Sequence, residues 1–353
     1  MKIGYANWLG LFLLGAGLQE EAAAQVDSSS KSNFTFSGYA EFYYSGQLSG
    51  ERVNAKPSYV YSHNRLHELA LNLALLKANY QADRLRANIG LGFGSYMQAN
   101  YAAEPSVLRH LYEANVGLRL TQKADLWLDV GVLPSHIGFE SAVGADNATL
   151  TRSILADNSP FFETGARLGY TTANQEWYMS LLLLNGWQHI QQNQGNTRPA
   201  FGHQLTWKPT ANLTLNSSSF IGNDKPDSLA QQRYFHNFYA QIKLSPKWQA
   251  TAAFDIGAEQ QAKDSKKYNY WYSPIVVLRY QPLEKLSLTG RAEYYEDRNN
   301  VIIALEEGDK FATWAYSLNA DYNILPNVNW RVEFRKWQVQ DAPQLSMALT
   351  ASF

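Results

Sequence analysis

The sequence of 353 residues contains no cysteine. This absence excludes disulfides, thiolate metal sites, a cysteine nucleophile and the lipidated cysteine of a lipoprotein anchor. Charged residues are also scarce, at 17% of the chain, where soluble domains usually hold about 25%. The formal net charge is only -1, so the composition gives no reason to expect nucleic acid or an anionic surface as a partner.

Long apolar runs are almost missing. Residues 3–19 carry no charge, Lys2 precedes them, and the small-residue pattern Ala22-x-Ala24 follows. This arrangement predicts a secretory signal peptide over residues 1–24, with an uncleaved membrane anchor as the alternative. Residues 25–33 are expected to form a polar periplasmic lead-in. Because no other run approaches the length of a membrane helix, a membrane-embedded form of this chain should be a barrel.

Aromatic side chains are abundant, with 22 tyrosines and ten tryptophans. Such amphipathic rings suit the boundary between a membrane and water, where barrel proteins carry aromatic girdles. They would also suit a sugar-binding β protein, so composition alone does not decide between the two.

The segment 343–353 alternates strictly between apolar and polar positions. One face holds Leu345, Met347, Leu349, Ala351 and Phe353, and the other holds Gln344, Ser346, Ala348, Thr350 and Ser352. Alternation with period two indicates a strand with one apolar side. The terminal phenylalanine resembles the recognition signal of outer-membrane barrel proteins, which implies contact with the barrel-assembly machinery.

The same alternation recurs along residues 34–353, where about 16 strands are separated by short turns and long polar connections in strict succession. Short turns on one end, longer loops on the other and an even strand number are typical of outer-membrane barrels. The sequence therefore predicts an all-β fold, a single transmembrane antiparallel up-and-down β-barrel. A soluble sandwich or propeller also gives alternation and frequent turns, but it would not favour charges at mid-strand.

Charged residues of both signs fall on the polar faces of these strands. The candidates for lining a channel are Glu41, Arg86, Glu113, Arg119, Asp129, Arg167, Asp255, Arg279, Arg291, Glu293, Arg331, Glu333 and Arg335. A barrel of about 16 strands leaves room for an aqueous channel, so these residues suggest a diffusion pore. The alternative is that they form stabilising pairs in a plugged lumen.

The longest connection, residues 134–162, is a candidate for a constriction loop, because loops longer than about 15 residues are usually functional or disordered. It holds Glu140, Asp146, Arg152 and Asp157. We expect its carboxylates to face wall arginines, such as Arg86, Arg119 and Arg167. An ordinary surface loop is the competing interpretation.

Three segments carry a family resemblance. They are residues 131–140 (GVLPSHIGFE), 185–188 (NGWQ) and 291–295 (RAEYY). In their order and spacing they resemble the recurrent motifs of the OmpL-like beta-barrel porin family. The resemblance implies a porin in the bacterial outer membrane, with no defined substrate and no catalytic residues.

The chemistry of an enzyme is not evident. None of the seven histidines lies in a nucleophile motif, and His63-x-x-x-His67 has metal-ligand spacing only on a helix. We therefore expect no catalytic residue, metal or cofactor. The expected function is passive diffusion of small hydrophilic solutes or ions, with outer-membrane lipid and a possible homo-oligomer as partners. The alternative is a plugged barrel acting as a surface receptor, adhesin or structural barrel.

Overall fold

The computed structural model describes residues 33–50, 52–305, 310–340 and 342–353. The expected signal peptide and nearly all of the expected lead-in lie outside these residues. Asn33, assigned to the lead-in from the sequence, is the first residue of a strand.

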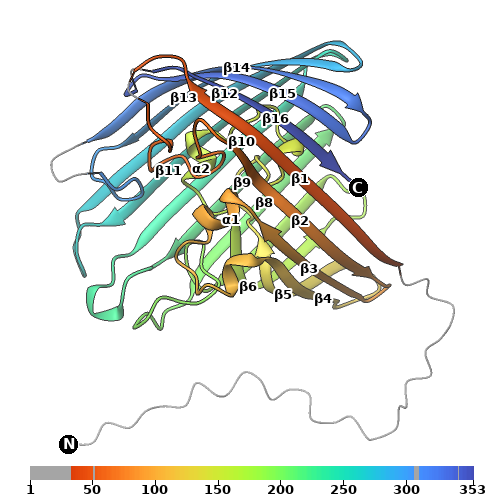
Figure 1. The fold of residues 1–353 in the computed structure, drawn as a ribbon. Helices are drawn as coiled ribbons and strands as arrows, with labels where there is room; N and C mark the ends of the chain where they lie inside the picture. Colours follow the sequence, from red (N-terminus) through yellow and green to blue (C-terminus); the bar gives the residue numbers. More distant parts are fainter. Residues whose placement is uncertain (1–32, 51, 306–309, 341) are drawn as a thin grey trace, which may run out of the picture.

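The described residues form one closed barrel of sixteen strands, in which every neighbouring pair is antiparallel and every pair except the closing one, β1 with β16, is sequential (Figure 1). This confirms the predicted fold class and strand number. The strands are β1 (Asn33–Gln47), β2 (Leu69–Gln81), β3 (Leu85–Phe93), β4 (Leu111–Arg119), β5 (Asp125–Pro134), β6 (Phe162–Thr171), β7 (Trp177–Leu184), β8 (Ala200–Thr210), β9 (Leu213–Gly222), β10 (Arg233–Lys243), β11 (Trp248–Gln260), β12 (Tyr268–Leu283), β13 (Leu286–Asp297), β14 (Phe311–Leu325), β15 (Val328–Trp337) and β16 (Gln344–Ser352).

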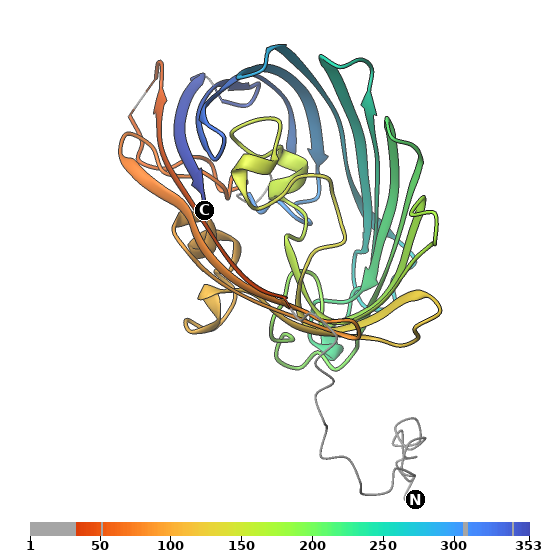
Figure 2. The same ribbon diagram turned by 90° about the vertical axis from the view of Figure 1, so that its right-hand side faces the viewer.

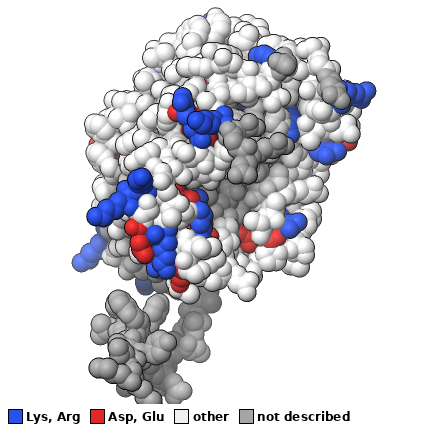
Figure 3. Space-filling model, turned by 90° about the vertical axis from the view of Figure 1, so that its left-hand side faces the viewer, with Lys and Arg blue, Asp and Glu red and all other residues white. Residues whose placement is uncertain are grey.

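The two ends of the barrel differ, as the sequence predicts. Turns such as 211–212, 284–285 and 326–327 join strands at one end, while the connections at the other end run to 48–68 and 135–161. Figure 3 views the molecule from the side toward which the long connections extend, and there Lys and Arg lie interspersed with Asp and Glu.

The outer wall is apolar because alternate side chains of each strand point away from the lumen. Large hydrophobic side chains are exposed on nearly every strand, for example Leu181, Val276 and Leu318. Two stacked aromatic pairs lie toward the short-turn end, where the ring centroids are 5.1 Å apart for Trp177 with Trp207 and 4.4 Å apart for Trp248 with Tyr280. Among the described residues, no helix has the length and apolar character needed to cross a membrane.

The barrel closes where β1 pairs with β16, from Tyr39 opposite Ser352 to Gln47 opposite Gln344. Beyond this ladder, the backbones of Gly38 and Phe353 exchange two hydrogen bonds of 2.6 and 2.9 Å. The Phe353 ring lies over Gly38 so closely that an added Cβ would meet it at 2.2 Å. Glycine at this position therefore leaves the space that the terminal aromatic ring occupies.

The connection between β5 and β6, residues 135–161, lies inside the ring of strands (Figure 2). We name it the lumen loop. It contains the short helices η2 (Gly144–Asp146) and α2 (Ile154–Asp157), and α2 contacts β12 and β13. Three further short helices, α1 (Ser95–Asn100), η1 (Leu108–His110) and η3 (Asp227–Leu229), belong to other long connections.

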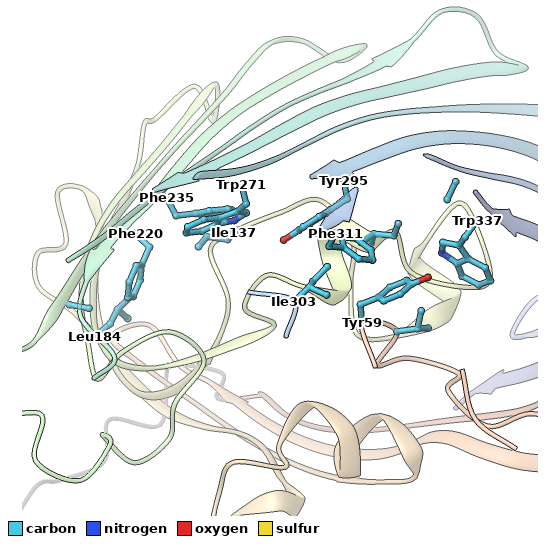
Figure 4. Packing of buried hydrophobic residues seen from close by; sticks show 14 of the residues in the cluster. Tyr59, Ile137, Leu184, Phe220, Phe235, Trp271, Tyr295, Ile303, Phe311 and Trp337 are labelled. Atoms are coloured by element: carbon cyan, nitrogen blue, oxygen red, sulfur yellow. The ribbon is translucent and has the colours of Figure 1, made fainter. Parts of the chain in front are cut away.

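A second interior feature is apolar and was not predicted. Inward side chains near the strand ends that lead into long connections pack against residues of those connections (Figure 4). We name this group the mouth cluster; it includes Tyr59, Ile137, Ile154, Leu182, Leu184, Phe220, Phe235, Trp271, Tyr295, Ile303, Phe311 and Trp337. The available sequence signal was the run from Leu181 to Leu184, which is apolar on both faces and therefore cannot be a strand with one wet side.

Candidate functional site: the lumen and its loop

Three arginines on the inner wall hold the lumen loop. Arg291 on β13 donates to the Thr151 carbonyl at 2.7 Å. Arg335 on β15 donates to the Arg152 carbonyl at 2.7 Å. Arg331, also on β15, donates to the carbonyls of Gly144 and Asn147 at 2.5 and 2.8 Å. Because all three guanidinium groups are almost completely buried, these bonds are sheltered from competition by water.

Two wall carboxylates complete this attachment. Glu333 accepts the Thr151 N–H and Glu293 accepts the Ile154 N–H, each at 2.6 Å. The same carboxylates pair with the arginines, since Arg291 lies 3.0 Å from Glu333 and Arg335 lies 2.6 Å from Glu293. The buried charges on β13 and β15 thus neutralise one another while they bind the backbone of the loop.

The start of the lumen loop has a separate anchor. His136 is buried, and its Nδ1 lies 2.7 Å from Glu163 while its Nε2 lies 2.8 Å from the Ser219 carbonyl. A carboxylate and a carbonyl both accept, so this arrangement favours a ring that donates from both nitrogens and carries a positive charge. Burial opposes this charge, but the Glu163 carboxylate outweighs it and raises the pKa of His136.

The lumen loop also packs against the connection 48–68. Asp157 accepts hydrogen bonds from the backbone and hydroxyl of Ser62, at 3.2 and 3.0 Å. Burial raises the pKa of Asp157 to about 6. Burial also lowers the pKa of Lys56, in the same connection, to about 7. Both side chains therefore lie in a region where charge is poorly solvated.

The other candidate residues of the loop make mostly internal contacts. Glu140 accepts the Ser153 N–H and hydroxyl at 3.0 Å, and burial raises the pKa of Glu140. Asp146 accepts the Ser141 hydroxyl at 3.1 Å. Arg152 is fully buried and donates to the Ala142 carbonyl. These contacts give the loop a defined shape of its own.

A loop carboxylate does face a wall arginine, since Glu140 lies 3.9 Å from Arg291, but the arginines named from the sequence were wrong. Arg86 and Arg167 do not meet loop carboxylates, because both pair with Asp129 on the wall, at 2.6 and 3.1 Å. Arg119 lies 3.5 Å from Asp83 in a short turn. The loop is hydrogen-bonded instead to side chains of β13 and β15. The closed order of the sixteen strands places β13 and β15 beside the loop. The alternation of side chains within one strand does not show which distant strand a loop will contact.

The remaining candidate residues also have wall or loop partners. Glu41 accepts from Asn72 at 2.7 Å, and Glu113 pairs with Lys77 at 2.7 Å. Asn237 donates to Asp255 at 2.5 Å, and Arg279 donates to Ser287 at 3.1 Å. Most of the charge predicted for the lumen is therefore engaged in short contacts.

Free volume gathers on the wall opposite these anchors. A cavity of about 840 Å³ is lined by residues of β5 to β10 and of the turn 172–176. A narrower space of about 110 Å³ separates residues 139–149 of the lumen loop from β10 to β12. Gln241 lines both spaces. The ring centroids of Phe139, in the loop, and Tyr239, on β10, lie 6.0 Å apart. The loop thus narrows the lumen from one side.

Comparison with known protein families identifies the family of this chain, because the match spans nearly the whole barrel. Residues 33–349 match the family described as "Putative beta-barrel porin-2, OmpL-like". The chain belongs to this porin family. The resemblance inferred from the sequence motifs is thereby confirmed, and the bacterial outer membrane is the location of this porin. No curated protein matches the chain.

Solved structures share the porin's fold at low identity. The outer membrane channel DcaP of Acinetobacter baumannii is 10% identical, with a TM-score of 0.63, covering 91% of this chain and 97% of its own. OmpF of Salmonella typhi, in complex with daunomycin, is 11% identical, with a TM-score of 0.61 and the same coverage. The trimer form of OmpT, an outer membrane protein of Vibrio cholerae, is 8% identical, with a TM-score of 0.59, covering 91% and 99%.

Proposed function

We propose that this outer-membrane porin lets small hydrophilic solutes or ions diffuse passively between the lumen loop and the wall formed by β6 to β12. The observation that carries the proposal is the loop itself. It is fixed to β13 and β15 by buried arginines, and the free volume lies on the opposite side. A polar interior of this kind stays hydrated and sets the field that a solute meets.

The charged wall residues have two roles in this proposal. Pairs such as Arg86 with Asp129 stabilise the wall and add little net field. Glu140, Asp146 and Arg279 border the narrow space, so they are the charged groups that passing solutes would meet there. The mouth cluster adds an apolar barrier toward the long connections, and apolar constrictions oppose the passage of ions when they exclude water.

Planar-bilayer recording tests the proposal. The purified, refolded full chain should give discrete single-channel currents in symmetric salt. If the protein inserts and resists denaturation but no current appears at any voltage, the proposal is wrong, and a plugged receptor or structural barrel becomes the better description.

We propose that the porin carries out no catalysis. The buried His136 lies between a carboxylate and a carbonyl, with no hydroxyl nucleophile among those two partners. Ester hydrolysis by the purified porin should equal that of a His136→Ala variant. A clear loss of hydrolysis in the variant would contradict this.

We infer that β16 is the segment read by the barrel-assembly machinery. Phe353 is 73% exposed just after the end of this strand, where it is accessible to a partner. A Phe353→Ser variant should accumulate unassembled in cells while refolding normally in detergent. Equal assembly of the variant and the native chain would contradict the inference.

We also propose a surface for homo-oligomers on the outer wall of β8 to β11. His203 lies 2.5 Å from the Ser219 hydroxyl, and His236 lies 2.9 Å from that of Ser217. A hollow of about 510 Å³ adjoins this group, with Ser217, Ala240 and Ala252 among its lining residues. Small residues allow close approach in membranes, and polar side chains there usually face protein rather than lipid. A second copy of the chain supplies such a face.

Cross-linking in native membranes checks the surface. Ser217→Leu fills the hollow and should abolish cross-linked oligomers. Ala292→Leu makes the same kind of change on the outer wall of β13 and should leave them unaffected. Equal oligomer yields in both variants would rule out this surface.

A further inference from the structure

The wall that borders the free volume carries little charge. Between their ends, β7 to β10 present uncharged inward side chains, including Ser180, Gln204, Thr206, Thr214, Asn216, Ser218, Asn237, Tyr239 and Gln241. The charged lining residues of the larger cavity are Asp125, Glu176 and Lys208. All three lie in or near short turns, so the part of this wall between the turns and the apolar mouth cluster presents mainly hydroxyl, amide and phenol groups.

Part of this wall is ordered into a fixed row of hydrogen-bonding groups. Thr206 donates to the Asn216 side chain at 2.7 Å, and Gln204 donates to the same oxygen at 3.2 Å. Asn216 in turn donates to Ser218 at 2.9 Å. Because these contacts set the orientation of each amide and hydroxyl, the wall is organised before any solute arrives.

Two tyrosines add aromatic surface. Tyr178 and Tyr239 both line the larger cavity, and Gln241 lies beside Tyr239 on the same inner face of β10. Tyrosine provides an apolar ring and a hydroxyl in one rigid side chain. A solute that has both C–H faces and many hydroxyl groups would match this combination, whereas an ion would lose hydration here without gaining a partner of opposite charge.

We propose that the wall of β6 to β10 is a binding surface for uncharged, hydroxyl-rich solutes of the saccharide class. The inference rests on the proposed channel function and assigns its preferred solute. The cavity volume of about 840 Å³ lies within the range of about 300–1,000 Å³ found for sites that take ligands of drug size. Tyr178, Tyr239 and Gln241 are the residues expected to contact the sugar.

The test uses the refolded full chain in planar bilayers, with maltotriose as the probe. We expect maltotriose to reduce the potassium chloride current in a saturable way, and the reversal potential in a salt gradient to stay near zero. In Tyr239→Ala and Gln241→Ala, the half-blocking sugar concentration should rise about two- to tenfold, the loss expected from one or two hydrogen bonds. Gln81 lies at the end of β2 and outside the cavity. Maltotriose should therefore block the current through Gln81→Ala at the same concentration as in the native porin.

The outcomes separate this inference from the channel function. Normal currents without block by maltotriose, or a reversal potential close to that of a single ion, would overturn the saccharide surface and leave the channel intact. Equal block in the native porin and in both cavity variants would also overturn it. The absence of any current would refute the channel and, with it, the preferred solute.

Discussion

Replacing Arg331 by methionine should release the part of the lumen loop nearest the narrow space. Arg331 donates to the carbonyls of Gly144 and Asn147, and both residues lie in or next to η2. Methionine can occupy most of the vacated volume without a polar group. The rest of the loop keeps its bonds to Glu293 and Glu333, so the expected opening is local.

The magnitude follows from the two bonds that are lost. Hydrogen bonds to a charged group contribute about 1.5–3 kcal/mol each, so detachment of this segment should become easier by about 3–6 kcal/mol. The ion pair of Arg331 with Asp321 lies within the wall, exists in both positions of the loop, and therefore cancels. With about 1.4 kcal/mol for each tenfold change, the detached population should rise by about one hundred- to ten-thousandfold.

Thiol labelling measures this population directly, because the native chain has no cysteine. Ala142 is only 6% exposed, so Ala142→Cys reports on detachment with a small side chain. Its labelling rate should rise about a hundredfold at the low end of the estimate when Arg331→Met is added, because the rate follows the detached population.

Arg86→Met is the matched control. It removes another inner-wall arginine, which pairs with Asp129 on the wall and not with the loop, and it should not change the labelling rate. If Arg331→Met speeds labelling of the Ala142→Cys thiol no more than this control does, Arg331 does not hold this segment of the loop, and the inferred attachment of the segment to β15 is wrong.

Three further predictions test the anchor, the mouth and the closure. The raised pKa of His136 means that its anchor is fully present below the ordinary value of about 6.5 and is lost as pH rises through the raised value. Single-channel noise should therefore grow as the pH is raised above the ordinary value in the native porin but not in His136→Gln. Trp271→Ala, in the mouth cluster, should raise conductance and cost about 3–5 kcal/mol of stability, whereas Trp248→Ala on the outer wall should leave conductance unchanged. Unheated protein should migrate faster than heated protein in detergent gels, and identical migration would contradict a closed barrel.

Alternation along each strand was enough to predict the barrel. It placed Phe42 and Leu349 on the lipid side and Glu41 and Thr350 on the other, and the pairing of β1 with β16 agrees with this. The reason is local, since successive side chains of any strand point to opposite faces. Lengths of connections likewise predicted which end carries the turns.

The sequence by itself therefore determined the strand number, the apolar exterior and the presence of a long connection with its own charges. Only the tertiary structure decided that this connection lies in the lumen, that Arg291, Arg331 and Arg335 hold it, and that Arg86 and Arg167 share Asp129 instead. It also decided that inward residues such as Trp271 meet the long connections in an apolar cluster. These outcomes depend on which residues far apart in sequence come within hydrogen-bonding distance once sixteen strands close, and closure is a property of the whole sheet that no single strand encodes.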